Sequence, residues 1–158
     1  MVIKLLCVGK IKEPHLQPAI DEYLRRIQHY IPIEYQEIKA ENRSKTEPDE
    51  QIKRREYEKI RQALAPNDCV IALDERGTHY SSEEFAAFLA RYQSRGDIKR
   101  LVFVTGGATG LAAQLLKDAH QTLSLSKMTF PHQLCRLFFL EQVYRALTIL
   151  AGESYHKS

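Results

Sequence analysis

The chain has 158 residues, 44% of them hydrophobic and 27% charged, so it has the length of one domain and an ordinary globular composition. No apolar run approaches the roughly 20 residues that cross a bilayer, and the short apolar N-terminal stretch has no cleavage site, so we predict a cytoplasmic protein without a membrane partner. The three cysteines are far apart in the sequence and predict no disulfides, and the six histidines lack the spacing of metal ligands, so no metal site is predicted. The net charge of +3 permits an RNA partner but does not favour one.

Strand-like and helix-like segments alternate along the first half of the chain. Strands are predicted at residues 2–8 and 31–38, where the pattern is typical of a strand. Helices are predicted at residues 14–30 and 49–64, where apolar residues recur every three to four positions. The polar residues 39–48 between them have no apolar period and are predicted to form a mobile loop.

The second half is more apolar. Short strands are predicted at residues 69–73, 101–105 and 123–125, and helices at residues 82–94, 111–120 and 131–151. Ser81 and Glu84 form a capping-box pattern before the first of these helices. This alternation predicts a single α/β domain over residues 1–158, with a mainly parallel sheet of five to six strands and helices on both faces.

The last predicted helix is apolar on nearly every side, which is typical of a helix with partners on more than one face. A homodimer could bury the second face, and a central helix wrapped within one chain is the alternative. Glu141 and Arg145 lie four residues apart on the remaining stripe, either as a simple ion pair or as polar groups directed at a site.

Three strand ends carry the sequence expected of a ligand site, because open α/β sheets bind ligands outside the carboxyl ends of their strands. They are residues 73–77, 105–110 and 123–132. Gly106 and Gly107 let the backbone approach a ligand closely, although a tight turn also needs glycine. The glycine turn at residues 106–110 lacks the lysine of a P-loop. It also lacks the GxGxxG pattern after a first strand that is typical of dinucleotide-binding domains. A glycine loop without phosphate-binding cations suits a ligand with adenosine but no phosphate, which fits S-adenosylmethionine.

Several motifs together resemble the RlmH (YbeA-type) family of SPOUT methyltransferases over the whole chain. They are LSLSKMTFPH at residues 123–132, GGxxGL at 106–111, the residues EQ and YR within 141–145, YHK at 155–157, VGK at 8–10 and LDxxG at 73–77. The resemblance implies a homodimer that uses S-adenosylmethionine to methylate N3 of a pseudouridine in the helix 69 loop of 23S ribosomal RNA, with the assembled ribosome as the expected substrate. It also implies a C-terminal trefoil knot that forms the cofactor pocket.

Residues are assigned to the cofactor through this resemblance and the strand ends. They are Leu73, Gly106, Gly107, Leu123, Ser124, Leu125, Ser126, Lys127 and Met128. For Leu73 and Leu125, ordinary packing in the strand core is the alternative.

Methylation of N3 requires that the base lose a proton, so a proton acceptor is needed. His132, His156 and Glu141 are candidates, and Arg145 could stabilise the developing negative charge. We favour the tail residues Tyr155 and His156, which the resemblance places near the cofactor. A solvated terminal histidine and a local capping role for His132 are the alternatives.

Basic residues could neutralise RNA phosphates, namely Arg25, Arg26, Arg91, Arg95, Lys99, Arg100 and Arg136. A non-catalytic RNA- or nucleotide-binding accessory protein of the ribosome is the competing function. It predicts the same alternation of strands and helices, but it does not account for the block at residues 123–132 or for the tail.

Overall fold

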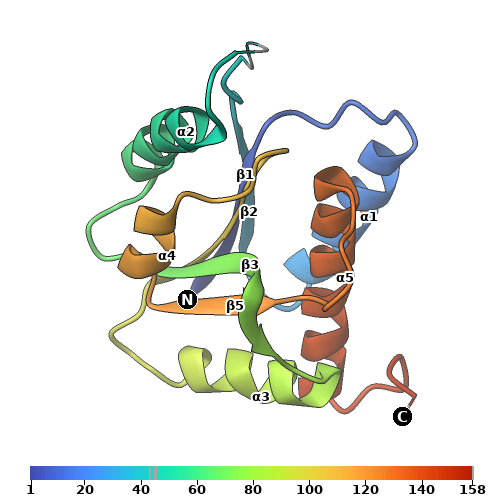
Figure 1. The fold of residues 1–158 in the computed structure, drawn as a ribbon. Coiled ribbons are helices and arrows are strands. Elements are labelled where there is room, and N and C mark those ends of the chain that lie inside the picture. The colour runs from blue at the N-terminus through green and yellow to red at the C-terminus, as the bar shows by residue number, and fades with distance from the viewer. Residues whose placement is uncertain (43, 45, 158) are drawn as a thin grey trace.

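Figure 1 shows the computed structural model of the chain, which describes residues 1–42, 44 and 46–157. Five strands form one sheet in the order β2-β1-β4-β3-β5. They are β1 (Val2–Val8), β2 (Ile33–Ile38), β3 (Cys69–His79), β4 (Arg100–Thr105) and β5 (Gln121–Ser124). Every neighbouring pair in this order is parallel, so the predicted parallel sheet is confirmed and the carboxyl ends of the strands meet at one edge.

Helices cover both faces of the sheet, as predicted. They are α1 (Leu16–Gln28), α2 (Asp49–Ala63), α3 (Ser82–Gln93), α4 (Ala113–Asp118) and α5 (His132–Leu150). Alternate strand side chains supply the two cores, because successive residues of a strand point to opposite faces. Leu5 and Phe103 pack with α1, α3 and α5, whereas Leu6 and Val104 pack with α2 and α4 on the other face (Figure 1).

The last helix, α5, lies between α1 and α3 and buries Phe139 and Val143 in the larger core. One apolar stripe near the start of α5 is left uncovered within the chain, with side chains at Leu134 and Phe138 that are 37% and 39% exposed, and Leu150 at the end of the helix is 43% exposed on another side. The helix is therefore central to the chain and still carries an apolar surface that a partner could cover.

The third strand, β3, differs most from the prediction, because it continues to His79 instead of ending at Leu73. Leu73 and Thr78 both pair with Leu123 of β5, so the intervening residues 74–77 bulge out of the ladder. Only glycine fits at position 77, because a Cβ atom there would lie 2.6 Å from the backbone of Leu123. The prediction missed this second half of the strand because the polar residues of the bulge interrupt the apolar run.

The other boundaries move by a few residues. α1 begins two residues after the expected start at Pro14, and α4 is confined to residues 113–118. The capping box before α3 is confirmed: the Ser81 hydroxyl accepts a bond from the backbone N–H of Glu84 at 3.1 Å, and the Glu84 carboxylate accepts one from Ser81 at 2.7 Å. None of the described helices combines the length and the apolar character needed to cross a bilayer.

The segment at residues 39–48 is irregular where it is described, and Arg43 and Lys45 lie outside the described residues. Arg55 and Lys59 of α2 pair with carboxylates of this segment, including Glu41. Its mobility stays a prediction.

Candidate functional site: a pocket at the carboxyl edge and a cluster at the tail

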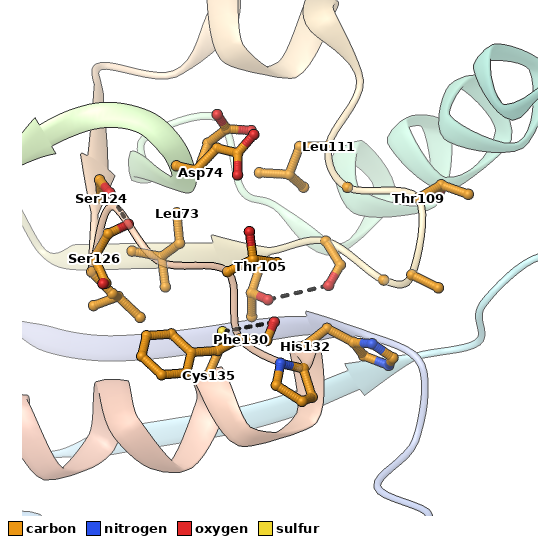
Figure 2. Close-up of a pocket in the computed structure, with 18 of the residues that line it drawn as sticks. Leu73, Asp74, Thr105, Thr109, Leu111, Ser124, Ser126, Phe130, His132 and Cys135 are labelled. Atoms are coloured by element: carbon orange, nitrogen blue, oxygen red, sulfur yellow. Dashed lines mark hydrogen bonds between the residues drawn. The ribbon is translucent and has the colours of Figure 1, made fainter.

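A cavity of about 660 Å³ lies at the carboxyl edge of the sheet, between the ends of β3, β4 and β5 and the first turn of α5. This volume is in the range of pockets that hold cofactor-sized ligands. Figure 2 shows Leu73, Thr105 and Ser124 at the strand ends, facing Phe130, His132 and Cys135 from the α5 side. The three strand ends identified in the sequence therefore meet in one place.

The glycine turn after β4 brings its two arms into backbone contact. A Cβ atom on Gly106 would lie 2.6 Å from the carbonyl carbon of Gly110, and Gly110 itself has a φ of +80°. The Gly110 N–H donates to the Gly107 carbonyl at 3.1 Å, and the Thr105 hydroxyl donates to the Gly106 carbonyl at 3.2 Å. The turn thus requires glycine for its own geometry, and it also leaves a side-chain-free wall on the cavity.

The segment between β5 and α5 forms the opposite wall. Its shape is set by bonds from serine side chains to its own backbone: Ser124 Oγ donates to the carbonyl of Ser126 at 3.0 Å, and Ser126 Oγ accepts from the N–H of Met128 at 2.9 Å. The Cys135 thiol donates to the Phe130 carbonyl at 3.8 Å. Cys135 thus has a structural bond in the wall, and burial raises the pKa of its thiol.

Most residues assigned to the cofactor from the sequence line this cavity. They are Leu73, Gly106, Gly107, Ser124, Leu125, Ser126 and Met128. Leu123 is instead buried in the sheet, where it pairs with β3, and Lys127 is exposed on the wall segment beside the lining residues.

Charges at the cavity are largely paired. Arg76 donates to Asp74 at 2.8 Å and holds the pKa of that carboxyl below its usual value, and Lys53 pairs with Glu50 at 3.2 Å. Lys53 of α2 and Arg76 of the β3 bulge, the two cations on the lining, are thus each paired with a carboxylate. This arrangement agrees with a ligand that lacks phosphate.

His132 stands in the first turn of α5 and lines the cavity. Burial lowers the pKa of His132, and the positive charges of Arg136 and Lys12 lower it further, because each disfavours the imidazolium form. The lowered pKa favours the neutral form of the ring, which is the form that can accept a proton.

The remaining catalytic candidates form a second group, which we call the tail cluster: Glu141, Arg145, Tyr155 and His156. Arg145 Nε donates to Glu141 Oε1 at 3.0 Å, and the Tyr155 hydroxyl donates to the same oxygen at 3.1 Å. Arg145 Nη1 lies 3.3 Å from His156 Nδ1. His156 Nε2 lies 2.7 Å from a carboxylate oxygen of Glu83 at the start of α3, and this contact lowers the pKa of Glu83 to about 2.

The structure does not bring the tail cluster to the pocket of the same chain. His132 and Arg145 are thirteen residues apart on α5, which corresponds to about 20 Å along the helix. In Figure 1 the C-terminus lies beside the start of α3, at the far end of α5 from its first turn. The structure therefore joins four of the five candidates to one another and leaves His132 at the cavity.

The prediction that Arg136 contacts phosphate is wrong. Its side chain is fully buried, with Nη2 donating to the Val8 carbonyl at 2.8 Å and Nη1 donating to Glu37 at 3.1 Å. The missed signal was helical spacing, because position 136 shares the inward face of α5 with Phe139 and Val143.

An open parallel sheet with a cavity at its carboxyl edge, closed by the first turn of a long last helix, defines an α/β ligand-binding protein. Residues 1–156 match the family described as "Predicted SPOUT methyltransferase", and the chain belongs to this family. A crystal structure of a probable methyltransferase from Bordetella pertussis Tohama I shares the fold, with a TM-score of 0.56, 13% identity and coverage of 92% of this chain and 93% of that one.

Within the family, the chain is similar to proteins named ribosomal RNA large subunit methyltransferase H. The one from Christiangramia forsetii is 44% identical over 156 residues, which cover 99% of each chain. The one from Caldicellulosiruptor saccharolyticus is also 44% identical, over 99% of this chain and 100% of its own. The resemblance drawn from the motifs is thereby confirmed, and the C-terminal knot that it implies stays a prediction.

Proposed function

We propose that this chain is a cytoplasmic, single-domain ribosomal RNA methyltransferase. It uses S-adenosylmethionine to methylate N3 of a pseudouridine in the helix 69 loop of 23S ribosomal RNA, on the assembled ribosome and as a homodimer. The observation that carries the proposal is that three of the motif segments, at residues 73–77, 106–111 and 123–132, converge on one cavity of cofactor size. The name of the similar proteins supports ribosomal RNA as the substrate.

The cavity fits S-adenosylmethionine in its chemistry. The collision that a side chain at Gly106 would cause keeps that wall as bare backbone, which can approach and hydrogen-bond a ligand closely. Leu73, Leu125 and Met128 offer apolar surface for an adenine ring. When bound, this cofactor supplies an electrophilic methyl group, and the protein's main task is to hold the target nitrogen in line with it.

The tail cluster suits the proton transfer that methylation of N3 requires. His156 is held between Arg145 and Glu83 and is the proposed proton acceptor, while Arg145 would stabilise negative charge on the base. Tyr155 and Glu141 position Arg145 through their shared hydrogen bonds, and the Arg145 guanidinium lies 4.8 Å from the Tyr155 ring centroid. His132 is the candidate that lies at the cavity itself.

A homodimer resolves the separation of the tail cluster from the cavity of its own chain. The exposed Phe138 of α5 stacks on Phe130 of the pocket wall at 5.6 Å between ring centroids, so the uncovered apolar stripe is continuous with the rim of the cavity. A second copy that covers this stripe is placed beside the cavity. We therefore propose that the tail of one subunit completes the pocket of the other.

The test of the function uses S-adenosylmethionine with a labelled methyl group. Purified protein is incubated with naked large-subunit RNA, isolated large subunits and assembled ribosomes, all from cells that lack this gene. We expect label in the RNA of assembled ribosomes, with N3-methylated pseudouridine recovered from the helix 69 loop. If no sample is labelled and calorimetry detects no cofactor binding, the methyltransferase proposal fails and a non-catalytic RNA-binding role takes its place.

The test of the shared site is a mixture of two inactive variants. Gly106→Val damages the cavity and His156→Ala damages the tail, so neither homodimer has a complete site. Unfolding and refolding the two together forms heterodimers in which one cavity and one tail are intact, and we expect transfer to return. A mixture that stays inactive would contradict the shared site and leave the function itself untouched.

A further inference from the structure

Two exposed lysines, Lys10 and Lys12, lie on the loop between β1 and α1, residues 9–15. Within residues 1–42, 44 and 46–157, neither ammonium group has a carboxylate partner, and the nearby Glu13 carboxylate lies 4.0 Å from His15. The loop therefore presents two free positive charges.

Three of the arginines chosen from the sequence as phosphate ligands behave differently. Arg25 pairs with a carboxylate at 2.5 Å, Arg95 at 2.8 Å and Arg100 at 2.7 Å. An RNA phosphate would have to compete with these carboxylates. The unpaired lysines of the β1–α1 loop are thus freer to bind phosphate than these three arginines.

The loop is also held in place by α5. The side-chain oxygen of Gln133 accepts hydrogen bonds from the backbone N–H groups of Lys12 and Glu13, at 2.7 Å and 3.2 Å. The Glu37 carboxylate accepts another from the N–H of Ile11 at 3.2 Å. Because the backbone is bonded at three consecutive residues, binding a phosphate here requires little ordering of the chain.

A buried arginine connects this loop to the pocket. Arg136 bonds the carbonyl of Val8, the last residue before the loop, and also Glu37, which in turn holds Ile11. Gly9 makes the turn into the loop with a φ of +88°. The first two turns of α5 therefore carry both the cavity wall and the anchors of the loop, and Lys12 lies close enough to the lining residue His132 to act on its charge.

We propose that Lys10 and Lys12 bind backbone phosphates of the RNA substrate at the rim of the pocket. This inference rests on the proposed function, because it assigns the surface through which the same RNA reaches the same cavity. Contacts to phosphate fix the register of a nucleic acid without reading its sequence. In a small chain of modest net charge, two ammonium groups on this held loop would position the strand so that an unpaired base can enter the cavity.

The experiment compares Lys10→Gln/Lys12→Gln with Arg25→Gln/Arg95→Gln, which removes the same charge from paired arginines. Binding to assembled ribosomes is measured as KCl is raised from about 50 to 200 mM, with Mg²⁺ held constant. For the lysine variant we expect the salt slope to fall by about one for each lysine, and KM for the ribosome to rise about tenfold. Its kcat and its affinity for S-adenosylmethionine are expected to stay unchanged, as is every value for the arginine variant.

A Lys10→Arg/Lys12→Arg variant keeps the charge and is expected to retain the wild-type slope. Wild-type slope and KM in the Lys10→Gln/Lys12→Gln protein would overturn the inference, and so would an equal loss in the arginine variant. These failures are distinct from failure of the proposed function, in which the wild-type protein labels no RNA at all.

Discussion

The two ends of α5 carry two different kinds of site. At its start, the cavity is formed by backbone at the strand ends and by serine side chains bonded to that backbone, with His132 as the lining histidine. At its end, Arg145 and His156 join carboxylates and a tyrosine in a network of titratable side chains, outside the cavity lining. One region is shaped to bind, and the other has the groups that move protons and stabilise charge.

This difference would let so short a chain have both of the proposed functions. A rigid cavity needs glycine and backbone contacts, which supply few acids and bases, whereas a proton-transfer network needs side chains that a tight glycine turn excludes. Placing them at opposite ends of one helix separates these requirements. The proposed homodimer would reunite them, and each of the following predictions tests one part of that division.

The largest effect is expected from removing the tail. Deletion of residues 155–158 takes away His156 and Tyr155, so we expect transfer to fall by about 10²- to 10⁴-fold, the usual contribution of a general base. Affinity for S-adenosylmethionine should change far less than the rate, because none of the deleted residues is among those that line the cavity. Single-turnover transfer and calorimetry measure the two quantities.

The control for the deletion removes only residues 157–158 and leaves the bonded tyrosine and histidine in place. It is expected to keep wild-type activity. Full activity after loss of residues 155–158 would show that the tail has no part in the chemistry.

The next effect concerns the cavity. In Gly106→Ala, the new methyl group would lie 2.6 Å from the backbone of Gly110, so one arm of the turn must move. A displacement of about 1 Å at a reacting site costs on the order of 100-fold in rate, and here we expect cofactor affinity to fall as well. Gly96→Ala is the matched control, because a Cβ atom there meets nothing within 4 Å. Equal behaviour of the two variants would mean that the turn does not shape the cofactor site.

Local chemistry explains which parts of this comparison could be predicted from the sequence. The capping box at Ser81, the glycine turn and the alternation of strands depend on neighbouring residues, and the structure reproduces them. The second half of β3 could not be predicted, because it depends on pairing with β5 after a polar bulge. The burial of Arg136 depends on Val8 and Glu37, residues about a hundred positions away. Such long-range contacts leave only weak traces in a single sequence.

The buried Arg136 joins the cavity wall to β1 and β2, so its removal should destabilise that end of α5. Arg136→Met removes the cationic donor to Glu37 and to the Val8 carbonyl, and Glu37 keeps the neutral donors Tyr35 and Ile11. We expect a loss of about 3 kcal/mol in the free energy of unfolding. Adding Glu37→Gln should recover part of this loss, because the uncompensated carboxylate is then gone. Urea unfolding of the two variants and the wild type measures both effects, and a loss of less than 1 kcal/mol would show that the network contributes little.

The smallest effect is a pH dependence at His132. The folded chain lowers the pKa of this ring, whereas in the unfolded chain it returns to about 6.5. Between these two values the unfolded chain binds more protons, so the stability that the neutral ring contributes is complete above pH 6.5 and is lost as the pH falls through the folded pKa. His132→Gln removes this contribution, and its free energy of unfolding should therefore decline less than that of the wild type between pH 8 and pH 5. Parallel curves for the two proteins would contradict a lowered pKa of this half-buried ring. Transfer by His132→Gln at pH 8 bears on the division of labour: retention within about tenfold would leave the proton acceptor in the tail, whereas a loss as large as the deletion causes would move it to the cavity.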